Sequence, residues 1–157
     1  MIKLTRIDDR LVHGQVAFTW VPALSADCLI VANDKVANDD FLKMTMGLAR
    51  PPAARLLILT VEKAISFLND PKSKNLKILL LVSGITDAFA MAAGVSEIKS
   101  VNFGGIRTRE GARLISKAVA VSDEDIAAIR KMIENGLELE LRQVPTDKKV
   151  LVKDLLQ

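Results

Sequence analysis

KILLLV, residues 77–82, decides the fold, because after its first lysine it is a run of apolar residues with no polar alternation. CLIVA (28–32) and RLLILT (55–60) repeat this pattern, and shorter apolar runs lie at 2–7 and 100–103. Unbroken runs of Leu, Ile and Val are typical of strands that are covered on both faces, as in a parallel sheet. The five runs therefore predict a mostly parallel central sheet.

Helix-like segments, with apolar residues at helical spacing, lie between these runs. The clearest one begins at Ser122, continues with three acidic residues in its first turn and ends at Gly136. In the first one, Pro22 is expected to end or kink the helix. The predicted helices cover 14–24, 38–49, 61–70, 86–95 and 122–136.

The C-terminal part of the chain has a different pattern. LELEL (137–141) alternates strictly, which predicts a strand with one solvated face at an edge of the sheet. VLVKDLL (150–156) is a candidate for a final short helix. No internal repeat or linker divides the chain, so residues 1–157 are expected to form one α/β domain. Its mostly parallel central sheet would carry helices on both faces and an edge strand near the C-terminus.

The bulk composition disfavours several classes of protein. Lys and Arg number 22 and Asp and Glu 19 in 157 residues, without a long basic block, so nucleic-acid binding is disfavoured. The longest apolar run, 78–82, falls far short of the roughly 20 residues of a membrane helix. Cys28 is the only cysteine, and charges interrupt the N-terminus where a signal peptide would be apolar. We therefore expect a cytoplasmic protein.

The chemistry is concentrated in RIDDRLVHGQV, residues 6–16, which spans the end of the first predicted strand. His13 is the only histidine of the chain. Ligands of open parallel sheets bind beyond the carboxyl ends of the strands, and His13 belongs to that rim. The carboxylate of Asp8 or Asp9 could accept a hydrogen bond from the protonated ring nitrogen of His13 and so fix its tautomer. The other ring nitrogen would then be a free nucleophile.

Groups that favour anions surround this histidine. Arg6 and Arg10 supply guanidinium groups, which suit phosphate oxygens. The amides of Gly14 and Gln15 lie where a helix is expected to begin, a position that favours negative charge. Together these groups predict a histidine that accepts a phosphoryl group.

Two other functions stay open on the residues alone. One is a module that binds a nucleotide or a phosphorylated metabolite without turnover, and the other is a hydrolase with His13 as general base. No metal site and no cofactor are predicted, since the sequence offers neither a Gly-rich phosphate loop nor a cysteine or histidine cluster.

RIDDRLVHGQV resembles the active-site signature of the IIB components of the mannose/fructose/sorbose family of the bacterial sugar phosphotransferase system (PTS). The resemblance covers nearly the whole chain. It includes the segments IVANDKVANDD (30–40), SVNFGGI (100–106), KAVAVSDEDI (117–126) and GLELELRQVPTD (136–147).

The resemblance implies a phosphotransferase with a phosphohistidine intermediate. IIB components of this family take a phosphoryl group from a histidine of a IIA protein and pass it to a sugar that enters through IIC and IID membrane subunits. Such a protein is expected to associate peripherally with the membrane permease. The edge predicted at LELEL is one through which two copies of the chain could pair as a homodimer.

The resemblance also implies roles for single residues. His13 matches the phosphorylated nucleophile, Arg10 would neutralise the phosphate in the transition state, and Asp8 would orient the imidazole. A phosphate-binding role for three further residues comes from the residue argument above and not from the resemblance: Arg6, Gly14 and Gln15.

Overall fold

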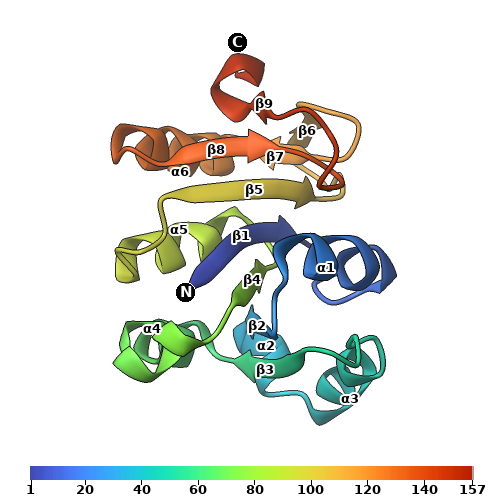
Figure 1. Cartoon of the computed structure of the whole chain (residues 1–157). Coiled ribbons are helices and arrows are strands. Elements are labelled where there is room, and N and C mark those ends of the chain that lie inside the picture. Colours follow the sequence, from blue (N-terminus) through green and yellow to red (C-terminus); the bar gives the residue numbers. More distant parts are fainter. Residues whose placement is uncertain (157) are drawn as a thin grey trace.

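The apolar runs form the sheet that they predict. A computed structural model describes residues 1–156, in which seven strands lie in the order β3-β2-β4-β1-β5-β8-β9 (Figure 1). All neighbouring pairs are parallel except β8 and β9, so the mostly parallel sheet is confirmed. The strands are β1 (Ile2–Asp8), β2 (Cys28–Ala32), β3 (Arg55–Leu59), β4 (Ile78–Val82), β5 (Ser100–Gly105), β8 (Glu138–Leu141) and β9 (Val150–Leu151).

Helices cover both faces of this sheet, as expected (Figure 1). On one face, α4 (Val61–Asn69), α5 (Ile85–Gly94) and α6 (Asp123–Glu134) pack on a large apolar core. The other face carries a smaller core, covered by the π-helix η1 (Val16–Trp20), α1 (Val21–Leu24), α2 (Asp34–Ala37) and α3 (Asp40–Leu48). Two 3-10 helices complete the chain: η2 (Pro71–Asn75) and η3 (Val152–Leu155).

Side-chain caps fix where the regular helices begin. Ser122 and Asp125 exchange side-chain to backbone hydrogen bonds of 3.1 and 3.0 Å in a capping box, and Gly136 follows α6 with a φ of +90°. Thr60 caps α4 and Asp39 caps α3 in the same way, through one side-chain bond each. The helices predicted in these regions are therefore confirmed to within two residues.

The first predicted helix differs from the expectation around Pro22. The helix continues through Pro22 to Leu24 and ends at Ser25, whose φ is 51°. The irregularity lies before the proline, where the N–H of Val21 donates to the carbonyl of Val16 in the wider π turn. Proline offers no N–H to the preceding turn, and a π turn is one way in which a helix accommodates this. The expectation that Pro22 ends the helix is wrong.

The expectation for LELEL is corrected in two respects. β8 is a strand, but it is not the edge, because β9 pairs antiparallel with Glu140 and Leu141. Its predicted solvated face is wrong at Glu140, which is only 2% exposed, but Glu138 on the same face is exposed. The Glu140 carboxylate accepts hydrogen bonds from Asn102 at 3.1 Å and from Arg142 at 2.9 Å. Alternation along one strand cannot reveal these partners.

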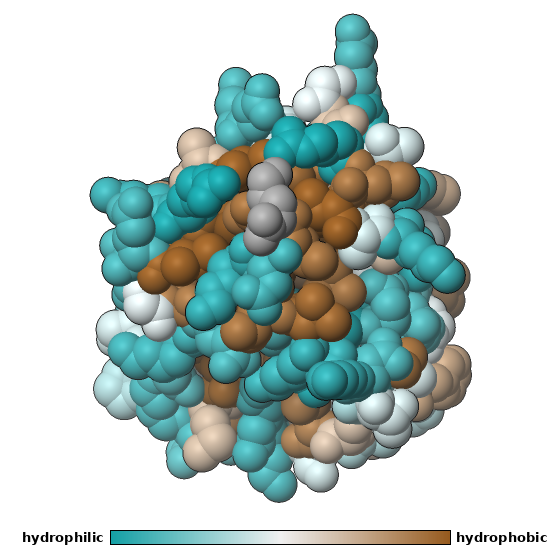
Figure 2. All heavy atoms as spheres, turned by 90° about the horizontal axis from the view of Figure 1, so that it is seen from above, coloured by the Kyte–Doolittle hydropathy of each residue, from teal (hydrophilic) through white to brown (hydrophobic). Residues whose placement is uncertain are grey.

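The C-terminal segment begins as a strand, so the helix expected over 150–156 is wrong for its first two residues. β9 is the edge strand near the C-terminus, and the 3-10 helix η3 then buries Val152 against the larger core. Figure 2 looks down on this side of the molecule and shows apolar surface broken up by polar side chains. Pairing of two copies through LELEL stays a prediction, with β9 already occupying part of that edge.

Residues 106–122 extend the rim beyond β5. They form a small antiparallel ribbon of β6 (Ala112–Leu114) and β7 (Ala120–Ser122), together with a parallel bridge between Ile106 and Val119. The sequence offered no specific expectation for the first half of this segment.

Candidate functional site

The turn after β1 brings His13 back over the end of that strand. The carbonyl of Asp8, the last residue of β1, accepts a hydrogen bond of 2.9 Å from the N–H of Leu11. Leu11 has a φ of 57°, a left-handed conformation that few residues other than glycine adopt. The side chains of Leu11 and Val12 are buried in the smaller core and hold this turn in place. His13 is therefore fixed at the carboxyl end of a central strand, with 14% of its side chain exposed.

Asp8 is the group that orients the imidazole. Its Oδ2 lies 2.9 Å from Nε2 of His13, and its Oδ1 accepts from the backbone N–H of Arg10 at 3.1 Å. An ionised carboxylate only accepts hydrogen bonds, so Nε2 carries the proton in this pair. Nδ1 of His13 has no hydrogen-bond partner among residues 1–156. In the neutral imidazole, Nδ1 is then the nitrogen that carries the free lone pair.

Asp9 has a different partner. Its carboxylate accepts from the backbone N–H of Arg107 at 2.8 Å and from Nε of the same residue at 3.0 Å. Of the two aspartates that the sequence left open, Asp8 is thus the one that contacts His13.

The exposed site residues surround His13. The Arg10 side chain is 57% exposed, and its Nε lies 4.0 Å from Oδ1 of Asp8. Gly14 and Gln15 are exposed and directly follow His13. The first bond of this helical segment runs from the N–H of Ala17 to the carbonyl of His13, at 2.9 Å, so the amides of Gly14 and Gln15 precede it. The structure brings these residues to one rim with His13 and Asp8.

Arg6 belongs to the interior and not to the rim. Its side chain is only 1% exposed, and Nη2 lies 3.3 Å from Oδ2 of Asp8. Burial lowers the pKa of the Arg6 guanidinium, against the opposing effect of the Asp8 carboxylate. The position favours contact with Asp8 over the direct contact with phosphate that the sequence suggested.

Four residues near the site were not singled out from the sequence. Asn102 and Glu140 lie buried in β5 and β8, and Trp20 and Arg142 stack against each other nearby. One signal was available for Asn102: an amide within the apolar run 100–103 requires a buried partner. The burial of Glu140 and its pairing with Arg142 could not be predicted in this way, because the alternating pattern of 137–141 indicated a half-exposed strand.

An open groove lies beside His13 at the same rim. It has a volume of about 670 Å³, and side chains from the β1 turn and from the segment after β5 line it. Its charged lining residues are the cations Arg10, Arg107 and Lys117 and the carboxylates Asp8 and Asp9. Arg107 is paired with Asp9, so Arg10 and Lys117 are the cations that favour an acidic partner.

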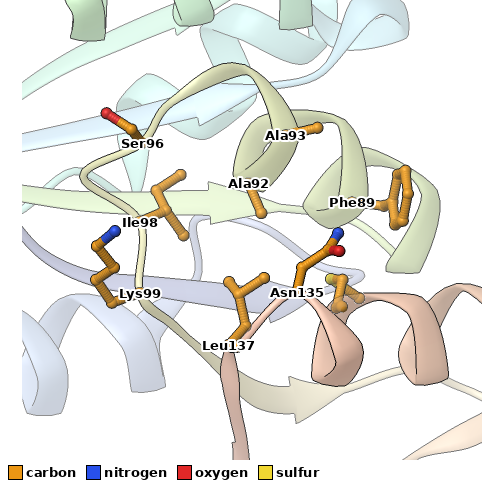
Figure 3. Close-up of a pocket in the computed structure, with 10 residues that line it drawn as sticks. Phe89, Ala92, Ala93, Ser96, Ile98, Lys99, Asn135 and Leu137 are labelled. Carbon is orange, nitrogen blue, oxygen red and sulfur yellow. The ribbon is translucent and has the colours of Figure 1, made fainter.

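A second, smaller cavity lies at the opposite ends of the strands. Figure 3 shows it between the C-terminal ends of α5 and α6, with Phe89, Ala92, Ile98 and Leu137 around it. Its volume is about 150 Å³, and Lys99 is its one charged lining residue among residues 1–156. It contains none of the groups that surround His13.

No group of three or more His, Cys, Asp or Glu side chains within residues 1–156 is arranged to hold a metal ion. In the same range, no helix has the length and apolar character needed to cross a membrane.

The chain matches the family model of the PTS system sorbose subfamily IIB component over residues 2–157, and it belongs to that family.

Relatives and solved structures agree with this assignment. The mannose-specific EIIAB component of the PTS from Escherichia coli strain K12 is 38% identical over 156 residues, which cover 99% of this chain and 48% of that protein. This chain thus spans about half the length of that relative. The sorbose-specific EIIB component from Lacticaseibacillus casei is 37% identical over 94% of this chain and 90% of its own. The crystal structure of the IIBSor domain of the sorbose permease from Klebsiella pneumoniae superposes with a TM-score of 0.94, at 33% identity, over 99% of this chain and 96% of that one.

Proposed function

We propose that this protein is a phosphotransferase that accepts a phosphoryl group on Nδ1 of His13 from a IIA phosphohistidine and transfers it to a sugar. One observation carries the proposal: Asp8 Oδ2 lies 2.9 Å from Nε2 of His13, which leaves Nδ1 as the unprotonated nitrogen. A nitrogen lone pair is the nucleophile that phosphoryl transfer needs. Membership of a sugar PTS IIB family supports the donor and acceptor classes.

Each step exchanges one bond to phosphorus for another. In the first, the bond between phosphorus and the donor imidazole nitrogen breaks while the bond to Nδ1 of His13 forms, and the donor nitrogen recovers its lone pair. The proton on Nε2 stays in place against Asp8. In the second, a hydroxyl oxygen of the sugar attacks phosphorus, the bond to Nδ1 breaks, and the hydroxyl proton leaves to water. Catalysis then depends on positioning and on charge neutralisation.

Arg10 is the residue we assign to charge neutralisation. Its guanidinium is exposed and lies close to Asp8, so it can reach a phosphoryl group on His13 without losing buried partners. The amides of Gly14 and Gln15 are assigned to the phosphate oxygens as weaker contributors, from their position directly after His13. No metal and no cofactor enters this mechanism.

The partners follow from the same proposal. A IIA protein would be the donor, and IIC and IID membrane subunits would present the sugar, with this chain in the cytoplasm at the membrane surface. The cationic groove beside His13 suits an acidic docking surface on either partner. Related chains are named for mannose and for sorbose, so the sugar itself stays open.

The test is phosphoryl transfer from phosphoenolpyruvate through the general PTS proteins and a IIA protein of the mannose family. Intact mass should show one acid-labile phosphate on the wild type and none on His13→Gln. Lys131→Gln, an exposed position in the last turn of α6 that does not line the groove, is a comparison that should still be phosphorylated. A wild type without phosphate, beside a IIA protein shown to carry it, would contradict the proposal once a second IIA protein gives the same result.

A further inference from the structure

Arg6 connects three strands through a buried group of polar side chains. Its Nη1 donates to Oδ1 of Asn102 at 2.7 Å and to the carbonyl of Arg142 at 3.0 Å, and its Nη2 donates to Oδ2 of Asp8 at 3.3 Å. The Nε of Arg6 is buried without a hydrogen-bond partner within residues 1–156. The charge of the guanidinium is thus directed mainly at one carboxylate, that of Asp8.

Gly104 provides the space that this arrangement needs. A Cβ on Gly104 of β5 would overlap Cζ and Nη2 of Arg6. A Cβ on Gly105, the next residue of the same strand, would have Ala118 O, 4.0 Å away, as its nearest neighbour. Only the first of these glycines is therefore needed for the position of Arg6.

Trp20 also contacts the guanidinium. Its ring packs near two guanidinium groups, with Cζ of Arg6 at 5.2 Å and Cζ of Arg142 at 5.1 Å from the ring centroid. Its Nε1 donates to the carbonyl of Gln143 at 3.1 Å. Since η1 begins three residues after His13, this stack ties the helix that follows His13 to Arg6.

Arg6 and His13 share one oxygen of Asp8. We propose that Arg6 is the positioning residue of the site: it balances the charge of Asp8 and holds Oδ2 against Nε2, so that the ring keeps a single proton there and Nδ1 stays a free nucleophile. The inference rests on the proposed role of His13 as phosphoryl acceptor. Arg6 acts through Asp8 and contacts neither the phosphoryl group nor the donor.

The charged groups around Asp8 determine how the loss of Arg6 would change the protonation of His13. Asp8 faces Arg6 from β1 and the exposed Arg10 from the turn, whereas Glu140 is already paired with Arg142 at 2.9 Å. Without the Arg6 charge, the Asp8 carboxylate attracts a second proton to the neighbouring ring. That proton occupies Nδ1, so the imidazole becomes cationic at a higher pH than in the wild type, and phosphoryl acceptance also moves to higher pH.

The single histidine makes the ring directly observable. Nitrogen-15 NMR of the labelled wild type shows one imidazole, and we expect its proton on Nε2 with Nδ1 unprotonated at neutral pH. A wild-type ring whose proton lies on Nδ1 overturns the proposal without any variant.

Three variants then separate position from charge. Arg6→Gln removes the charge, Gly104→Ala keeps the charge but displaces the guanidinium, and Gly105→Ala adds the same methyl group one residue further on. We expect the first two to take up the second ring proton at higher pH and to accept phosphoryl groups about 10- to 100-fold more slowly at pH 7, with recovery as the pH rises. Gly105→Ala should match the wild type in both measurements.

The outcomes distinguish this inference from the proposed function. Wild-type imidazole spectra and pH profiles in folded Arg6→Gln and Gly104→Ala overturn the role of Arg6. If Arg6→Gln fails to fold by circular dichroism, the comparison of Gly104→Ala with Gly105→Ala decides. A wild type that no phosphorylated IIA protein can phosphorylate contradicts the proposed function, whereas the imidazole spectra still report whether Arg6 controls the ring.

Discussion

β4 and β1 lie side by side at the centre of the sheet but differ in what they bury. β4 is entirely apolar and entirely buried, whereas β1 buries Arg6 and Asp8 and pairs Arg6 with Leu81 of β4. An apolar strand gains free energy simply by leaving water. Buried polar groups must each find a partner, and here the partners come from β5, β8 and the turn after β1. The comparison teaches that β4 mainly stabilises the fold, whereas β1 carries the site and depends on partners from other elements to offset the cost of burying polar groups.

The largest expected effect on stability comes from making β1 resemble β4. Arg6→Leu removes the buried guanidinium that faces Asp8 and Asn102. The Asp8 carboxylate loses its buried counterion and Oδ1 of Asn102 loses its donor, so we expect the free energy of unfolding to fall by about 3–5 kcal/mol, the usual cost of breaking a buried ion pair. Urea unfolding followed by circular dichroism measures it. An unchanged unfolding midpoint would show that the polar group of β1 is not needed for stability.

A slightly smaller effect is expected from opening a cavity under β4. Leu80→Ala deletes a fully buried side chain of the larger core and should lower the free energy of unfolding by about 2–5 kcal/mol. Since Leu80 lies on the face opposite to the smaller core that holds the His13 turn, the folded variant should keep the wild-type imidazole spectrum. A changed ring tautomer would mean that the two strands do not divide their roles as we describe.

The smallest effect on stability is expected at the exposed end of the same polar region. Arg10→Ala should change the free energy of unfolding by no more than about 0.5 kcal/mol, because the side chain is more than half exposed. The rate of phosphoryl acceptance should nevertheless fall, since Arg10 is assigned to the phosphate. Urea unfolding and the phosphoryl-transfer assay, on the same sample, test both halves. Loss of stability with a normal rate would give Arg10 a purely structural role and contradict its assignment to the phosphate.

The strands and the regular helices could be predicted because their signals are local. Runs such as 28–32 and 78–82 match strands almost residue for residue, and Ser122 marks its helix by a capping box that four consecutive residues encode. The rim position of His13 also followed from local order, since it directly follows the first strand.

What could not be predicted depends on partners that are distant in the chain. The burial of Glu140 is set by Asn102 and Arg142, and that of Arg6 by Gly104 and Trp20, so no pattern within one strand reveals them. The resemblance indicated Asp8, but the residues alone left Asp9 open as well, because the choice between them depends on the left-handed turn at Leu11. The π turn before Pro22 likewise reflects how one helix is fitted against the smaller core.

The packing of Trp20 near the guanidinium groups of Arg6 and Arg142 has an optical consequence. The chain contains no tyrosine and no other tryptophan, so its near-ultraviolet emission comes almost wholly from this one indole. The emission wavelength of an indole depends on the electric field across its ring, and two nearby guanidinium groups contribute to that field here. Any event at His13 that shifts Arg6 by way of Asp8 should therefore change the fluorescence of the unlabelled protein. The proposed phosphorylation of His13 could then be followed in real time by tryptophan fluorescence.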